Sequence, residues 1–399
     1  MLSEIAFRGN EDSEVSGQRS SKNHDKPLRS RRYHGKNKEV TRVRRATAIL
    51  IGAAVACAAV TGAAAQSKPS GRWAIVIHGG AGDIERAKLG PDGDKAYRAA
   101  LTKVVEAGAA VLDHGGSSLD AVEAAIRVLE DDPLFNASRG AVFDADGKTE
   151  LDAAIMDGAT MRAGAVADVT RTRYPITLAR AVMEKTPYVL MVGPGADAYS
   201  KQVGMEQVEP SYFFTESRWQ SLIKQLQSEG RPIPPRPAGV PPQGAVVPVA
   251  QWQEAADARR YGTVGVVVVD RSGNVAAGTS TGGLQGKMQG RVGDSPIIGA
   301  GTYASNQSCA VSGTGVGEYF IRFTVARDVC ALVQYKGYTL QQAADEVIQK
   351  QLAPIHGDGG VIVVAPDGQM AWSFNTPGMF RARQAEGGKI EVHIYNDEP

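Results

Sequence analysis

One segment constrains the fold more than any other. Residues 263–270, Thr-Val-Gly-Val-Val-Val-Val-Asp, form an almost unbroken run of β-branched side chains. Such a run is typical of a strand that is buried on both faces, because a half-exposed strand would alternate apolar and polar residues. Arg271-Ser272-Gly273 then supplies a turn, and residues 274–281 follow as the partner strand. We therefore expect a layered fold that covers this strand from both sides.

Strand and helix patterns alternate along the rest of the chain from Gln66. An apolar run predicts a strand at 73–77 that leads into the Gly-rich loop 78–82, His-Gly-Gly-Ala-Gly. Two groups of paired strands and helices flank one linker, which fits an α/β fold with sheets packed face to face under helices. The further elements that we expect are helices at 101–112, 118–130 and 318–335, and hairpins at 140–156 and 360–374.

Prolines mark the break between the two groups. Residues 228–243 contain six prolines, which is too many for a helix or a central strand. We expect a mobile linker here, at about residues 215–262.

The segment 42–65 has the order of a secretory signal peptide. Three arginines precede a long uncharged run that ends on small residues, with Ala63 and Ala65 at Ala-x-Ala spacing. We interpret the segment as a signal that is cleaved before Gln66, which predicts a periplasmic or secreted protein. A single membrane anchor is the alternative, because the run is about long enough to span a bilayer.

Charge is distributed unevenly. The chain carries a net charge of +1, but residues 1–45 carry +6, which leaves −5 for the remainder. Residues 1–41 lack apolar periodicity, and we expect them to form a disordered basic extension. Because the rest is weakly acidic, no nucleic-acid partner is expected.

Three cysteines in 399 residues cannot form a disulfide framework, and no Cys or His spacing suits zinc. Neither redox chemistry nor a structural zinc ion is therefore expected. Cys309 and Cys330 could pair in an oxidising compartment or stay as two buried thiols, and the sequence leaves both alternatives open.

The strongest candidate for chemistry is Thr263. A threonine hydroxyl is a weak nucleophile that needs a nearby base, and a free α-amino group on the same residue is one known solution. Cutting the chain between Gly262 and Thr263 would create that group, which titrates near neutral pH. A serine hydrolase is the competing hypothesis, since 278–282 match G-x-S-x-G with Asp294 and His356 downstream. We reject it because glycines, rather than a helix, follow the serine.

Several Gly-rich motifs accompany Thr263 in a fixed order. They are the loop 78–82, Gly262–Gly265, Ser280–Gly283, Gly290–Pro296, Gly299–Gly301 and Ser312–Glu318. This series closely resembles the plant-type asparaginase/isoaspartyl peptidase family of N-terminal nucleophile hydrolases, over residues 72–395. The resemblance implies a four-layer αββα sandwich made as a precursor that cleaves itself before Thr263. The products would be an α subunit, 66–262, and a β subunit, 263–399, which associate as an (αβ)₂ dimer.

The resemblance also implies a role for each matching residue. Thr263 matches the nucleophile, Thr281 a second threonine that assists it by hydrogen bonding, and Asn136 an asparagine near the nucleophile. Arg291 matches the residue that holds the substrate α-carboxylate, a task suited to its bidentate fork. Asp294 matches the acceptor of the substrate α-ammonium group. As an alternative, Arg291 and Asp294 could simply pair with each other on a loop.

Other matching positions complete the site and separate two branches of the family. Thr314 and Gly315 match the hydroxyl and the backbone N–H that stabilise an oxyanion. Glycosylasparaginases typically have Asp before the nucleophile, Asn in the second motif and T-G-x-G-D in the last. This chain has Gly262, Gly282 and Glu318 there, and so resembles the asparaginase branch.

The segment 129–139 resembles the sodium-binding loop of the family, where mostly backbone oxygens hold the ion. Oxygen ligands suit a hard, non-redox cation. Ser138 departs from the pattern, because the family commonly has glycine there, which puts the conformation of the loop in doubt. The residues that match the ion site are Leu129, Glu130, Asp132, Phe135, Ala137 and Arg139.

The function implied is hydrolysis of the side-chain amide of L-asparagine and of β-aspartyl dipeptides, through an acyl-enzyme on Thr263. No cofactor is required for this chemistry, and a structural sodium ion is expected. A glycosylasparaginase-like amidase is one alternative. A secreted binding protein that keeps the scaffold but is neither cleaved nor catalytic is another. The sequence does not rank L-asparagine against β-aspartyl dipeptides.

Overall fold

Two β-sheets form the centre of the computed structural model, which describes residues 71–242 and 262–399. The eight-stranded sheet has the order β12-β11-β1-β5-β6-β2-β3-β4, and the four-stranded sheet has the order β10-β9-β8-β7. The strands are β1 (Ala74–Gly82), β2 (Leu151–Asp157), β3 (Ala163–Val169), β4 (Leu190–Val192), β5 (Val264–Val269), β6 (Val275–Thr281), β7 (Thr302–Ala304), β8 (Ala310–Gly315), β9 (Gly359–Val364), β10 (Met370–Phe374), β11 (Gly378–Ala385) and β12 (Glu391–Tyr395).

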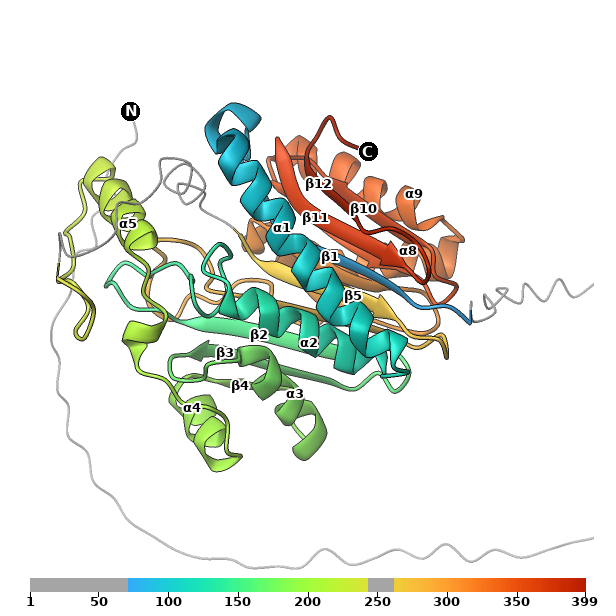
Figure 1. Cartoon of the computed structure of the whole chain (residues 1–399), viewed down its shortest axis with the longest axis horizontal. Coiled ribbons are helices and arrows are strands. Elements are labelled where there is room, and N and C mark those ends of the chain that lie inside the picture. Colours follow the sequence, from blue (N-terminus) through green and yellow to red (C-terminus); the bar gives the residue numbers. More distant parts are fainter. Residues whose placement is uncertain (1–70, 243–261) are drawn as a thin grey trace, which may run out of the picture. The chain divides into compact units, whose positions relative to one another are not determined.

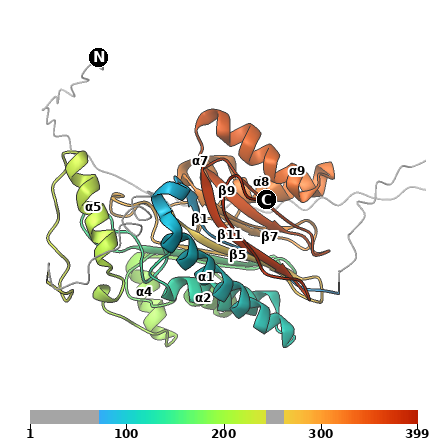
Figure 2. The same ribbon diagram turned by 45° about the horizontal axis from the view of Figure 1, so that its top comes forward.

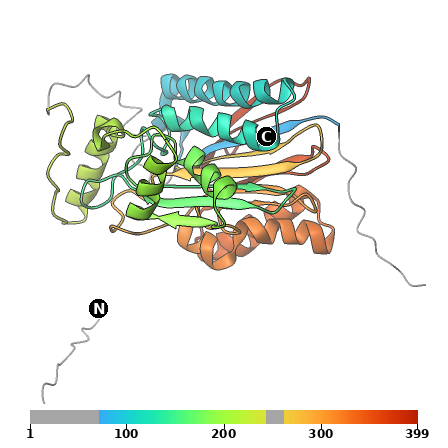
Figure 3. The same ribbon diagram turned by 90° about the horizontal axis from the view of Figure 1, so that it is seen from below.

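Helices cover the outer face of each sheet. Helices α1, α2 and α3 pack on the large sheet, whereas α8 and α9 pack on the small one (Figures 1–3). The predicted αββα sandwich is therefore confirmed. The helices are α1 (Arg86–Asp113), α2 (Ser118–Asp131), α3 (Pro175–Lys185), α4 (Gly193–Gln202), α5 (Glu216–Ser228), α7 (Gly317–Phe323), α8 (Val325–Lys336) and α9 (Leu340–Asp345), and α9 continues as a π-helical segment, Glu346–Leu352.

Strand β5 lies inside, as its sequence predicts. Val264, Val266 and Val268 belong to the core between the large sheet and α1–α3, whereas Val267 and Val269 belong to the core between the two sheets. All five side chains are fully buried. The β-branched run thus supplies both hydrophobic cores of the sandwich, one from each face of a single strand.

Two predicted elements differ from the structure. Residues 141–150 form no strand, because their backbone pairs with a loop: the Gly286 N–H donates to Phe143 O and the Ala145 N–H to Lys287 O. The predicted helix 318–335 is two helices, because Thr324 adopts a left-handed conformation with φ 48° between α7 and α8.

The predicted linker begins too early. Residues 216–228, which we assigned to it, form α5, whose Trp219, Leu222 and Leu226 pack on Phe143 in a small separate core. These apolar residues recur at helical spacing, and that periodicity outweighs the prolines that follow. Residues 243–261, the predicted extension and the predicted signal peptide all lie outside the described residues. Among the helices that are described, none has the length and apolar character needed to cross a bilayer.

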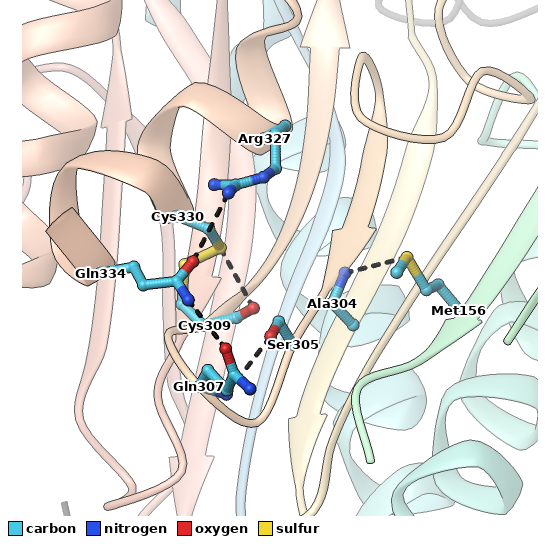
Figure 4. The surroundings of a disulfide bond; sticks show 8 residues. All are labelled: Met156, Ala304, Ser305, Gln307, Cys309, Arg327, Cys330 and Gln334. Atoms are coloured by element: carbon cyan, nitrogen blue, oxygen red, sulfur yellow. Dashed lines mark hydrogen bonds between the residues drawn. A yellow bond between two sulfur atoms is a disulfide. The ribbon is translucent and has the colours of Figure 1, made fainter. Parts of the chain in front are cut away.

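A disulfide joins Cys309 and Cys330, which settles the alternative that the sequence leaves open. Cys330 lies in α8, and Cys309 immediately precedes β8 (Figure 4). Near the disulfide, the Gln334 side chain donates to Gln307 Oε1. The bond therefore ties a covering helix to the sheet beneath it.

Loss of this disulfide should lower stability. The bond closes a loop with a sequence separation of 21 residues, and loop-closure entropy in the unfolded chain then predicts a stabilisation of about 3 kcal/mol. Urea denaturation of the Cys309→Ala/Cys330→Ala variant should show a correspondingly lower free energy of unfolding. Reductant should destabilise the native sequence but not the variant; equal sensitivity of both would contradict the assignment.

Candidate active site

A cleft of about 200 Å³ opens at one end of the large sheet. Val264 pairs with Ser280, so the start of β5 and the end of β6 meet there. The cleft brings together side chains and backbone from four motifs that are far apart in sequence. Its lining residues are Thr263, Thr281, Gly283, Leu284, Arg291, Gly293, Asp294, Ser295, Gly315, Val316, Gly317 and Glu318.

Two threonines form the reactive end of the cleft. The Thr263 hydroxyl donates to Thr281 Oγ1 at 3.1 Å, and the Gly283 N–H donates to the same Oγ1 at 3.0 Å. Both threonine side chains lie almost completely out of solvent. The N–H of Gly283 therefore polarises Thr281, which in turn orients the hydroxyl of Thr263.

The peptide bond between Gly262 and Thr263 is closely packed on its amino side. A Cβ added to Gly80 would lie 2.6 Å from the Gly262 Cα, and one added to Gly262 would lie 3.2 Å from the Asn136 Cβ. Asn136 is itself fixed, because its Nδ2 donates to Gly283 O at 2.9 Å and its Oδ1 accepts from the Val142 N–H. The structure therefore places Asn136 beside Gly262, the residue before Thr263.

The cleft lining also carries charge of both signs. Arg291 bonds Glu318 through its Nε and Nη2 atoms, each at 2.9 Å from a carboxylate oxygen. The alternative in which Arg291 pairs with Asp294 is therefore wrong. Glu318 occupies only one edge of the guanidinium fork, which leaves the Nη1 side for another anion.

Asp294 is a buried carboxyl group that faces this cleft. Its Oδ2 atom has no hydrogen-bond partner within residues 71–242 and 262–399. Burial raises the pKa of Asp294 to about 7, although the positive charge of Arg291 opposes the shift. A cationic group placed in the cleft beside the Asp294 carboxyl would stabilise its ionised form, so an ammonium ligand is favoured here.

Thr314 and Gly315 occupy the end of β8. Gly315 lines the cleft, whereas the fully buried Thr314 lies just behind the lining residues. Thr314 Oγ1 accepts the Ala81 N–H at 3.4 Å, which connects this position to the end of β1.

Ser138 adopts the backbone conformation that glycine would favour. Its φ is +43°, in the left-handed region, and its hydroxyl donates to Arg173 O at 2.6 Å. This hydrogen bond offsets part of the conformational cost of a non-glycine residue there.

The loop that matches the sodium site is rich in buried backbone. Pro133 has no N–H, so the Leu129 carbonyl lacks the donor that a continuing helix would supply. The Glu130 carbonyl accepts the Arg139 N–H at 2.9 Å, and a Cβ added to Gly140 would lie 2.6 Å from Pro133 O and 2.8 Å from Phe135 O. A carbonyl oxygen has two lone pairs, so this backbone fits a hard monovalent cation. No cluster of His, Cys, Asp and Glu in the described residues suits a metal ion of another kind.

The rejected serine-hydrolase hypothesis fails in the structure as well. The Ser280 hydroxyl points away from the two reactive threonines and donates to Glu130 Oε1 at 2.7 Å. Neighbouring residues of a strand face opposite sides of the sheet, and so Ser280 and Thr281 cannot both enter one cleft.

Sequence reasoning missed a buried support beneath the cleft. Lys287 and Glu150 form an ion pair of 3.4 Å, with side chains 1% and 3% exposed. The Glu150 carboxylate also accepts the N–H of Gly290, at 3.3 Å, directly before Arg291. Glu150 and Lys287 are 137 residues apart in the sequence, so no local motif indicates that they form a pair.

The fold and the site together have the organisation of N-terminal nucleophile hydrolases: a hydroxyl nucleophile at the start of a central strand in an αββα sandwich. Comparison with known proteins agrees. Residues 71–394 match the family described as "Asparaginase". The chain belongs to this family.

The match to individual relatives extends over nearly the whole length of each relative. The chain is 43% identical to the isoaspartyl peptidase of Escherichia coli K12, over 82% of this chain and 98% of that protein. A probable isoaspartyl peptidase/L-asparaginase 2 of Arabidopsis thaliana is 43% identical, over 82% and 99%. The human isoaspartyl peptidase/L-asparaginase is 37% identical, over 81% and 96%.

Proposed function

We propose that this protein hydrolyses the side-chain amide of L-asparagine and of β-aspartyl dipeptides, with Thr263 as the nucleophile. One observation carries the proposal: Thr263, Arg291 and Asp294 line a single cleft. A ligand with an α-carboxylate, an α-ammonium group and a side-chain carbonyl matches this arrangement. The names of the relatives support the same two substrates.

Each step of the reaction uses residues that line the cleft or directly adjoin its lining. Once the bond after Gly262 is cut, the α-amino group of Thr263 takes the proton of its own hydroxyl, and Oγ1 attacks the substrate carbonyl carbon. The Thr314 hydroxyl and the Gly315 N–H receive the negative charge that develops on the carbonyl oxygen. The α-ammonium group of Thr263 returns the proton to the leaving ammonia or amino acid, which leaves an aspartyl ester on Oγ1.

Water completes the cycle. It attacks the ester carbonyl while the Thr263 amino group accepts its proton, and that proton then returns to Oγ1 as aspartate leaves. Throughout the cycle, Arg291 binds the α-carboxylate of the substrate and Asp294 binds its α-ammonium group. They bind the substrate in a fixed orientation, so the carbonyl lies within reach of the nucleophile.

Turnover of the purified protein tests the proposal. We expect ammonia from L-asparagine, and free aspartate from β-aspartyl-leucine, at rates that rise in parallel with the fraction of cut chain. Absence of both activities in fully cut protein would overturn the proposal, and an uncut chain without either activity would favour the non-catalytic alternative. A glycosylasparaginase-like amidase would instead require turnover of N-glycosylated asparagine at a higher kcat/KM.

The pH dependence of kcat/KM should show the ionisation of Asp294. Its pKa is raised to about 7, so it is protonated below that pH and cannot receive an ammonium group. The Thr263 amino group must also be neutral, and an α-amino group has an ordinary pKa of roughly 8. Below pH 7, the logarithm of kcat/KM for L-asparagine should therefore approach a slope of about two per pH unit.

Succinamate, which is asparagine without its α-amino group, is the control substrate. It needs no ionised Asp294, so its acid limb should keep a slope near one. Equal slopes for both substrates would contradict the role that we assign to Asp294.

We also propose that a sodium ion is held by backbone oxygens of the loop 129–139. The buried loop and the missing N–H of Pro133 support this site. Exchange of sodium for choline at constant ionic strength should lower the thermal midpoint, because only the folded chain presents the oxygens together. An unchanged midpoint would argue against the site.

We propose further that the protein is exported and self-associates. The signal-like segment 42–65 and the disulfide support export, because disulfides persist in oxidising compartments. The edge strand β4 exposes Leu190 and Val192, next to exposed Tyr188 and Val189, which supports a second copy as partner. Cell fractionation tests export, and light scattering of the purified protein tests association.

A further inference from the structure

A line of polar side chains crosses the interior between the two sheets. The imidazole of His78 contacts Thr263 O through Nδ1 and Ser312 Oγ through Nε2, both at 3.0 Å. Ser312 Oγ lies 2.7 Å from Thr279 Oγ1, which lies 2.6 Å from Thr302 Oγ1. Thr263 directly precedes β5, and the other residues come from β1, β6, β7 and β8; His78, Ser312, Thr279 and Thr302 are fully buried. Polar groups in such a position are costly unless their hydrogen bonds are satisfied.

The carbonyl of Thr263 fixes the direction of these bonds. A carbonyl only accepts, so Nδ1 of His78 must carry the proton and donate it. Nε2 then accepts from Ser312, which leaves Ser312 Oγ to accept from Thr279 and Thr279 Oγ1 to accept from Thr302. Burial lowers the pKa of His78 to about 3, which agrees with a neutral ring. The Thr263 carbonyl therefore selects one tautomer of His78, and the hydroxyl groups can adapt to it.

Gly265 leaves the room that this arrangement needs. A Cβ added to Gly265 would lie 1.9 Å from Ser312 Oγ and 2.3 Å from His78 Nε2. Any other residue would push the ring or the hydroxyl away. The glycine in the β-branched run thus has a specific packing reason, two residues after Thr263.

Thr263 itself lies outside the regular sheet pairing. Strand β5 begins at Val264, and its pairing with β1 ends where Gly265 faces His78. The His78 ring therefore holds a carbonyl that the strand ladder does not. Once the chain is cut before Thr263, that residue loses its peptide link on the other side, and the bond from His78 becomes a main restraint on its backbone.

We propose that His78 is a positioning residue for the nucleophile: its Nδ1–H holds the Thr263 carbonyl and so sets the direction of Oγ1 and of the α-amino group during turnover. Ser312, supported by Thr279 and Thr302, holds the other ring nitrogen and so fixes the orientation of the ring. This inference rests on the proposed function, because it assigns a role within that reaction. His78 touches neither substrate nor reacting atoms.

Two substitutions of His78 distinguish the role of its Nδ1 atom from that of its Nε2 atom. The amide of asparagine overlays Nδ1 of histidine, whereas the amide of glutamine overlays Nε2. His78→Asn can still donate to Thr263 O, but His78→Gln can reach only Ser312. His114→Gln is the matched control, because His114 is an exposed histidine at the end of α1. Each variant is measured as cut protein, with rates divided by the fraction of chain that begins at Thr263.

We expect His78→Gln to lower kcat for L-asparagine about tenfold or more, with KM within about twofold, since loss of one hydrogen bond misplaces the nucleophile but not Arg291 or Asp294. His78→Asn should recover most of kcat, and His114→Gln should match the native sequence. Equal kcat losses in the Asn and Gln variants, or a change confined to KM, would overturn the proposal.

Ser312→Ala gives a second test should His78→Gln fail to fold or to be cut. Without Ser312 the ring loses the hydrogen bond at Nε2 that fixes its orientation, so kcat should fall by about threefold or more while KM is unchanged. An unchanged kcat would overturn the proposal. A native protein that is cut but turns over neither substrate would instead refute the proposed function, and so the two failures remain distinguishable.

Discussion

Replacement of Thr263 by alanine should abolish both cleavage of the chain and hydrolysis. The Thr263 hydroxyl is the one that Thr281 orients in the cleft, at 3.1 Å, and the mechanism uses it in both reactions. We expect kcat for L-asparagine to fall by at least about 10⁴-fold, as for other removed nucleophiles. Gel electrophoresis and an ammonia assay measure the two effects separately.

Thr263→Ser is the matched variant for this prediction. It keeps a hydroxyl and an α-amino group, so some cleavage and turnover should survive, whereas Thr263→Ala should show neither. Cleavage of the alanine variant at Gly262 would mean that another group cuts the chain. Turnover by that variant would mean that the nucleophile lies elsewhere.

Arg291→Lys should selectively impair substrates that carry an α-carboxylate. Glu318 bonds one edge of the Arg291 guanidinium, through Nε and Nη2, which orients the remaining edge toward the cleft. A lysine offers a point charge with no such fork. Loss of a charged hydrogen bond of about 2–3 kcal/mol should lower kcat/KM for L-asparagine roughly 30- to 150-fold.

β-Alaninamide, which is asparagine without its α-carboxylate, is the control substrate for this variant. Its kcat/KM is low with the native protein and should change little in Arg291→Lys. Arg322→Lys, on the surface of α7, should leave both substrates unaffected. An equal loss on L-asparagine and β-alaninamide would show that Arg291 supports the cleft in general and does not bind the carboxylate.

Much of the fold could be predicted from local patterns. The run 263–270 has no exposed face, and β5 indeed contributes to both cores of the sandwich. Ser117 also caps α2, as its position before a helical pattern suggests. These features depend on neighbouring residues, so the sequence displays them directly.

The errors lie where distant contacts decide the local structure. Residues 141–150 resemble a hairpin arm, but the loop at Gly286 takes their backbone hydrogen bonds. The predicted linker wrongly includes α5, because the prolines after Ser228 outweighed the helical spacing of Trp219 and Leu222. Nothing local marks the break at Thr324, because a non-glycine residue rarely adopts a left-handed conformation.

For the site, motifs identified what lines the cleft but not what supports it. Thr263, Thr281, Arg291 and Asp294 meet as predicted, because each belongs to a motif of its own. The contact of His78 with the Thr263 carbonyl spans 185 residues, and no spacing rule predicts it.

Intact mass and N-terminal sequencing of the purified, incubated protein test the central claim most directly. We predict two fragments, one of which begins at Thr263, because the account requires the α-amino group of that residue to be free. A single chain that stays uncut through long incubation, or a cut at any other bond, would contradict it.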